Sequence, residues 1–143
     1  MPERTDNSSD WHAACAQVSI DFSVAIDHGD FQRVLSLFTE HGSLIRFGQA
    51  SRGQAELRKW LFEERPAQVI RHVCSNFSGK LVTPTEVHGT TYFTAYRALG
   101  EHALPITGTV PFMVGEWEDV FERTAAGWRI KSRTVKVVFQ AAV

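Results

Sequence analysis

The hydrophobic pattern of this chain changes at Pro66. Before Pro66, apolar residues recur every three or four positions, as they do on one face of an α-helix. After Pro66, apolar and polar residues alternate almost to the end of the chain, which is typical of strands with one buried face. Helices followed by consecutive strands predict an α+β fold, in which the helices lie on one face of an antiparallel sheet.

The part before the change is expected to form three helices. The first starts at Ser9 or Asp10, either of which suits an N-cap, and stops at the turn around Gly29. The second is short and covers residues 31–38. The third covers residues 54–66, where the proline stops it.

The sheet is expected to contain one short strand and four long ones. The short strand lies over residues 41–53, between the second and third helices. The long strands are predicted over Gln68–Lys80, Glu86–Leu99, Val110–Arg123 and Trp128–Gln140. Long antiparallel strands with one covered face curl, so the sheet is expected to enclose a hollow under the helices.

Composition limits the partners of this chain. A length of 143 residues suits one domain, which we place at residues 9–143 behind a frayed tail at residues 1–8. The formal net charge is −1 without a basic cluster, which argues against nucleic acid or an anionic membrane as partner. We expect a cytoplasmic protein, because no signal peptide or membrane span is found and Cys15 and Cys74 form no C-x-x-C pair.

Asp27 and His72 are the first candidates for chemistry. Asp27 lies at the end of the first helix among apolar residues, where an unpaired buried carboxylate would cost several kcal/mol, so it is expected to find a partner. If the helix end lies over the hollow, Asp27 can hold one imidazole nitrogen of His72 and leave the other facing the hollow. The alternative is a solvated Asp27 and a structural His72, and spacing alone favours this alternative.

Six further side chains are candidates for substrate contacts. Two tyrosines on one strand face could donate phenolic hydrogen bonds, although such pairs are more often cross-strand packing. An asparagine that alternation places on the face of His72 could orient a polar group, or simply be satisfied near the strand end. A methionine and a tryptophan on one strand, and a tryptophan of the third helix, could line or close the hollow, although core packing is the more common role. These candidates are Tyr92, Tyr96, Asn76, Met113, Trp117 and Trp60.

Motifs for metal, nucleotide or nucleophilic chemistry are missing. The other histidines show no metal-ligand spacing, and there is no G-x-S-x-G, phosphate loop or dinucleotide fingerprint. We therefore expect no metal and no cofactor, and a small, largely apolar molecule as the partner.

Four stretches between Trp11 and about Val138 resemble the SnoaL-like polyketide cyclases of the nuclear transport factor 2-like superfamily. They are VAIDHGDFQRVLSLFTEHGSL, IRHVCSNFSGKLV, TTYFTAYR and GEWEDVFERTAAGWRIKSRTV. The resemblance implies a cone-shaped α+β fold with an apolar pocket, and a homodimer or homotrimer. In similar proteins, such as scytalone dehydratase and hexachlorocyclohexane dehydrochlorinase, the matching Asp and His form a catalytic dyad that moves protons without a cofactor. The positions here are Asp27 and His72.

The sequence departs from scytalone dehydratase at two positions. Ile26 stands where that enzyme has a tyrosine, and Arg97 stands near its second histidine. The function predicted from sequence is therefore a dehydratase-like, cofactor-independent lyase or isomerase that acts on a small apolar cyclic molecule. The alternative is a non-catalytic module, which either binds a ligand or serves assembly as the β subunits of ring-hydroxylating dioxygenases do.

Overall fold

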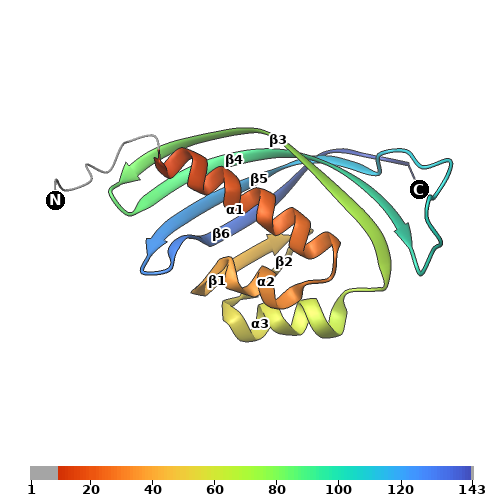
Figure 1. Cartoon of the computed structure of the whole chain (residues 1–143), viewed down its shortest axis with the longest axis horizontal. Coiled ribbons are helices and arrows are strands. Elements are labelled where there is room, and N and C mark those ends of the chain that lie inside the picture. Colours follow the sequence, from red (N-terminus) through yellow and green to blue (C-terminus); the bar gives the residue numbers. More distant parts are fainter. Residues whose placement is uncertain (1–9, 143) are drawn as a thin grey trace.

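Two helices, a pair of short strands and a third helix precede the four long strands of a six-stranded sheet (Figure 1). The computed structural model describes residues 10–142, so the predicted tail and the cap at Ser9 lie outside the described residues. The elements are α1 (Asp10–Asp27), α2 (Phe31–Ser36), β1 (Phe38–Arg46), β2 (Gln49–Arg52), α3 (Gly53–Lys59), the π-helical turn η1 (Trp60–Glu64), β3 (Gln68–Thr83), β4 (Glu86–Leu99), β5 (Met113–Thr124) and β6 (Gly127–Gln140). The α+β class is confirmed, and the four long strands begin and end within three residues of their predicted bounds.

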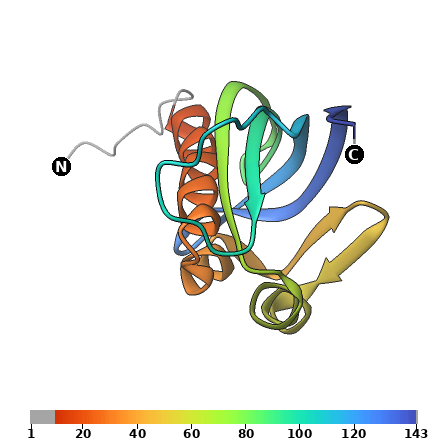
Figure 2. The same cartoon turned by 90° about the vertical axis from the view of Figure 1, so that its right-hand side faces the viewer.

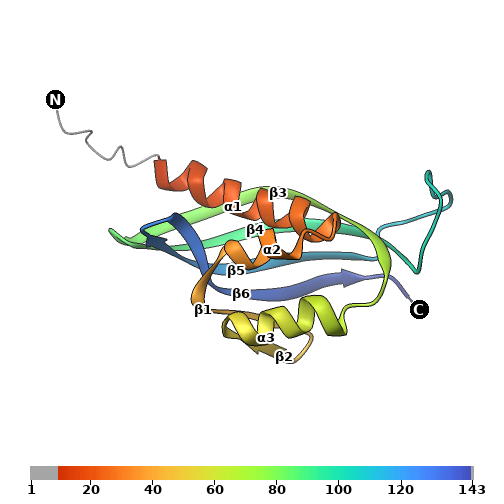
Figure 3. The ribbon, with the colours of Figure 1, turned by 60° about the horizontal axis from the view of Figure 1, so that its bottom comes forward.

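The sheet is mixed rather than purely antiparallel. Its strand order is β2-β1-β6-β5-β4-β3, and β1 pairs with β6 in parallel. The other neighbours are antiparallel. Figure 3 shows β1 and β2 at the β6 edge of the sheet, with α3 beside them. The predicted antiparallel arrangement was wrong at this edge, because the direction of β1 depends on how α2 delivers the chain to β6, which is distant in sequence.

Residues 41–53 do not form the single short strand that was expected. Strands β1 and β2 form a hairpin in this region, and the turn between them is Phe47-Gly48. Both turn residues have positive φ, +46° and +74°, which suits a tight two-residue turn whose twist matches the strands. Phe47 is an unusual residue for such a conformation, so the hairpin had no clear signal in the sequence.

Helix α1 lies across one face of the curved sheet and supplies much of the core. Seen end on in Figure 2, α1 lies beside β3, while the β1–β2 pair lies at the other edge of the sheet. The predicted apolar face of α1 is buried, and the Phe22 ring contacts the Trp117 ring edge to face, with 5.3 Å between their centres. Within the described residues, no helix is long and apolar enough to cross a membrane.

A buried ion pair lies beneath α1. The side chains of Arg133 and Asp119 have no exposed surface, and Arg133 donates from Nε and Nη2 to the two carboxylate oxygens, both at 2.8 Å. Nη2 also donates to Ser19 Oγ of α1 at 2.8 Å. The pair forms because the hairpin register of β5 and β6 sets Asp119 directly opposite Arg133.

Candidate active site

Asp27 reaches the sheet because α1 ends at this residue. The chain turns away at Gly29, whose φ of +71° is a conformation that glycine adopts at little cost. The last residue of α1 therefore lies over the first part of β3, where His72 is opposite Ala95 of β4. A carboxylate at a helix C-terminus faces the negative end of the helix dipole, so it needs hydrogen-bond donors nearby.

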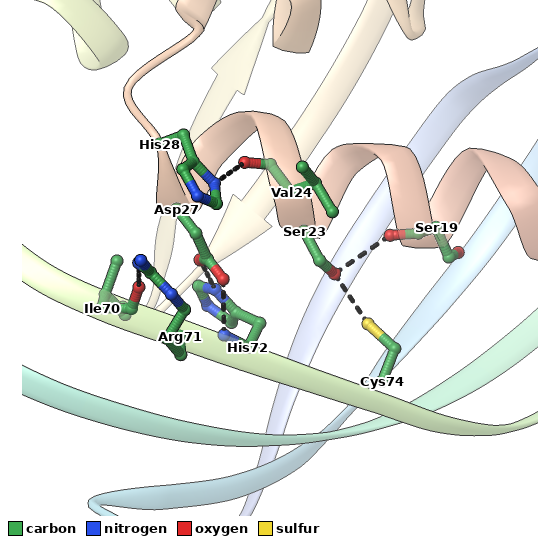
Figure 4. A network of polar contacts seen from close by, with 9 residues as sticks. All are labelled: Ser19, Ser23, Val24, Asp27, His28, Ile70, Arg71, His72 and Cys74. Carbon is green, nitrogen blue, oxygen red and sulfur yellow. Dashed lines mark hydrogen bonds and ion pairs between the residues drawn. The ribbon is translucent and has the colours of Figure 1, made fainter.

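Both donors come from His72 (Figure 4). Oδ1 of Asp27 lies 2.6 Å from the imidazole Nδ1, and Oδ2 accepts the backbone N–H of the same residue at 2.8 Å. The Asp27 side chain is 4% exposed and that of His72 is 14% exposed. Because a carboxylate accepts hydrogen bonds, the neutral ring carries its proton on Nδ1, and Nε2 keeps a free lone pair.

His72 faces a pocket of about 400 Å³. This volume suits a small cyclic molecule. The apolar wall includes Ile26 of α1, Phe93 of β4 and Trp117 of β5. The imidazole lies against two of these rings, with 5.9 Å between its centre and that of Phe93 and 5.7 Å to that of Trp117. The imidazole is therefore held against aromatic rings, where its position is constrained by packing as well as by Asp27.

Three of the six predicted contact residues line this pocket together with His72. They are Trp60, Met113 and Trp117. Met113 and Trp117 are also core residues, 5% and 2% exposed, so their packing and lining roles coincide. Trp60 belongs to η1, where the chain leaves α3.

Tyr92 and Tyr96 do not line the pocket, which corrects their predicted placement. They lie on the other face of β4 and are 45% and 38% exposed. Alternation divides the residues of β4 between two faces, and the sequence did not decide which of these faces lines the pocket. The pairing of Ala95 with His72 does decide, because directly opposed residues share a face and the pocket face therefore carries Phe93 and Ala95.

Asn76 also lies away from the pocket. It is exposed and has a φ of +53°, at a bulge where the pairing of β3 with β4 shifts between Ser75 and Ser78. One extra residue in β3 breaks the strict alternation that would have placed Asn76 on the face of His72. Phe77 turns inward instead and packs against Phe121, with 6.2 Å between the ring centres.

Cys74 follows His72 at the next inward position of β3, but α1 covers it. Its Sγ lies 2.7 Å from Ser23 Oγ, and Ser23 Oγ donates to the Ser19 carbonyl at 3.0 Å (Figure 4). Burial raises the pKa of the Cys74 thiol. Because the thiolate is the reactive form, this thiol is poorly suited to act as a nucleophile at neutral pH.

Sequence reasoning missed three arginines of the pocket. Arg46, Arg65 and Arg97 all line it. Alternation from Phe93 through Ala95 would have placed Arg97 on the pocket face. Arg46 and Arg65 carry no such signal, because their convergence depends on the β1–β2 hairpin and on the end of η1.

The fold and site define a member of the nuclear transport factor 2-like superfamily of α+β cone folds. Residues 8–134 match the model of the SnoaL-like domain. The chain therefore belongs to the SnoaL-like family. No curated protein matches the chain.

Solved structures support the same fold. A proposed scytalone dehydratase from Novosphingobium aromaticivorans is 17% identical, with a TM-score of 0.77 over 92% of this chain and 87% of that one. A hexachlorocyclohexane dehydrochlorinase from Novosphingobium barchaimii is 13% identical, with a TM-score of 0.76 over 92% and 88%. A proposed aromatic ring hydroxylase from Novosphingobium aromaticivorans is 18% identical, with a TM-score of 0.79 over 92% of both chains. At these identities the likeness concerns the fold.

Proposed function

We propose that this protein is a cofactor-independent lyase or isomerase, dehydratase-like in its chemistry, which acts on a small cyclic molecule. The observation that carries the proposal is the Asp27–His72 pair, joined at 2.6 Å, with the imidazole at the wall of an apolar pocket. Two similar structures bear names of elimination enzymes, a dehydratase and a dehydrochlorinase, which agrees with this reaction class.

In the proposed reaction, His72 Nε2 removes a proton from a carbon of the bound ring. In an elimination, the electron pair of the broken C–H bond forms a C=C bond and the leaving group departs with its own bonding pair. In an isomerisation, the same pair forms an enolate and His72 returns the proton to another carbon. Asp27 holds the ring in the reactive tautomer and stabilises the imidazolium that forms, because its two oxygens already accept the ring Nδ1–H and the backbone N–H of His72.

Proton abstraction can be tested before the natural substrate is known. We would incubate the protein in D₂O with a panel of small cyclic ketones and follow exchange of the carbon-bound hydrogens next to the carbonyl by NMR. Catalysed exchange with at least one compound that fits the pocket is expected. If ligands bind but none exchanges above the uncatalysed rate, the protein is a binding module and the proposal is wrong.

Asp27→Asn is expected to lower the catalysed exchange roughly 10- to 100-fold. An asparagine has only one acceptor oxygen for the two N–H groups of His72, and its NH₂ group would donate to Nδ1 and move the ring proton to Nε2. The readout is the exchange rate, with the thermal midpoint as a check of the fold. Asp30→Asn, an exposed cap of α2, is the control and should leave the rate unchanged.

Ala95→Leu is expected to weaken ligand binding at least about 10-fold, because the larger side chain would fill the pocket opposite His72. The measurement is calorimetric titration with 2-naphthol, a neutral bicyclic probe. Ala98→Leu makes the same change on the other face of β4 and serves as the control. Equal affinities of the two variants would show that the probe does not occupy this pocket.

A further inference from the structure

The pocket that holds His72 carries an excess of positive charge. Arg46 comes from the end of β1, Arg65 from the residue after η1, and Arg97 from β4. Among the residues that the structure describes, Glu64 is the one acidic residue that lines the pocket. A cavity built only for a neutral ring would have no need of these groups, and the desolvation of the buried Arg46 and the half-buried Arg65 is costly.

Each guanidinium group is held against an aromatic ring. The Cζ atom of Arg46 lies 4.1 Å from the centre of the Trp60 ring, and that of Arg97 lies 4.4 Å from the centre of the Phe112 ring. Arg65 lies 5.5 Å from the centre of Trp60 and 5.7 Å from that of Phe31. Such contacts fix the position of a guanidinium group without using its N–H donors.

Most of these donors remain available to a ligand. Arg46 Nη1 donates to Ser51 Oγ at 3.1 Å. Among residues 10–142, no carboxylate lies within ion-pair distance of the three groups, and Arg65 and Arg97 donate no hydrogen bond from their guanidinium groups. The contrast with Arg133 is direct, because that buried guanidinium has a bidentate carboxylate of its own.

Nearby carboxylates compensate only in part for the burial of Arg46 and Arg65. Burial lowers the pKa of Arg65, the charge of Asp27 raises it, and the charge of Arg46 lowers it again. Burial likewise lowers the pKa of Arg46, and Glu64 opposes this shift. The charge of Asp27 thus acts on Arg65, and Arg65 lines the same pocket as His72. Arginine stays protonated in such surroundings, so an anion would be stabilised there.

We propose that the natural ligand is a cyclic acid, whose apolar ring lies against His72 and whose carboxylate binds to Arg46, Arg65 and Arg97. This inference names the substrate class for the function proposed above and, as far as the reaction is concerned, rests on it. A carboxylate is the group that fits best, because its two oxygens match the paired N–H donors of a guanidinium group.

The test is a matched pair of probes that differ only in charge. The affinities of 2-naphthoate and 2-naphthamide for the wild-type protein would be measured by calorimetric titration at pH 7.5 and low ionic strength. The acid is expected to bind at least about 10-fold more tightly than the amide, and the difference should shrink in high salt. Equal affinities, or tighter binding of the amide, would overturn the inference.

Variants of the arginines test whether these residues cause the preference for the acid over the amide. The double variant Arg65→Gln/Arg97→Gln should lose most of the preference for the acid while it keeps the affinity for the amide, which also reports that the pocket is intact. Arg58→Gln is the control, because Arg58 is an exposed guanidinium group that stacks on Phe62, at 5.5 Å, and does not line the pocket. An unchanged preference in the double variant would overturn the inference, since the acid would then bind elsewhere.

A His72→Gln variant separates this inference from the proposed function. The preference for the acid should persist without the imidazole, and its loss would mean that His72 rather than the arginines binds the anion. A wild-type protein that prefers the acid but catalyses no proton exchange would retain the cyclic-acid inference and refute the enzymatic function. Catalysed exchange without any preference for the acid would support the enzymatic function and refute the cyclic-acid inference.

Discussion

His72→Ala is expected to lower the rate of catalysed proton exchange by roughly 10²- to 10⁴-fold, the usual contribution of a positioned general base. The imidazole is the group of the pair that faces the pocket, whereas Asp27 contacts His72 from behind with a side chain that is 4% exposed. Removal of the ring therefore removes the atom that accepts the proton. The measurement is the exchange rate at saturating compound, compared with the wild-type protein.

Two controls show that the loss would be chemical rather than structural. His28→Ala removes an exposed imidazole beside the same helix end, where Nδ1 contacts the Val24 carbonyl at 2.8 Å, and it should leave the rate unchanged. Imidazole added to the His72→Ala protein should restore part of the rate, because the deleted ring leaves space next to the pocket. Full activity of His72→Ala would refute the proposed base.

Asp119→Ala is expected to lower the free energy of unfolding by about 3–5 kcal/mol, the cost of leaving one partner of a buried ion pair uncompensated. Arg133 has no exposed surface, and its guanidinium group lies against the rings of Trp117 and Phe22, 4.2 Å and 4.5 Å from their centres. It has no route to solvent without disturbing the contact of α1 with the sheet. Urea denaturation at pH 7 would measure the change.

Asp21→Ala is the matched control for this stability change. Asp21 pairs with Arg33 at 3.2 Å, and the two side chains are 30% and 53% exposed. Removal of such an exposed pair should cost at most about 1 kcal/mol. Comparable losses in the two variants would contradict the view that the Arg133–Asp119 pair anchors α1 to the sheet.

The sequence alone was sufficient for the order and type of the main elements. Hydrophobic periodicity is a local property, and it reports helix or strand wherever one face of an element is buried. This is why β4 was predicted at its observed bounds, Glu86–Leu99, and why the apolar face of α1 was correct. The contact between Asp27 and His72 was also anticipated, partly from the cost of an unpaired buried carboxylate and partly from the family resemblance. The catalytic role of the pair stays a prediction.

Only the tertiary structure decided which side chains reach the pocket. A strand has two faces. One extra residue at the bulge of Asn76 reverses the face on which the following side chains of β3 lie, and the pairing of Ala95 with His72 sets which face of β4 lines the pocket. The parallel pairing of β1 with β6 and the presence of Arg46, Arg65 and Arg97 in the lining of one pocket depend on segments far apart in the chain. Local periodicity carries no information about such encounters, because it describes each element alone and not the register in which elements meet.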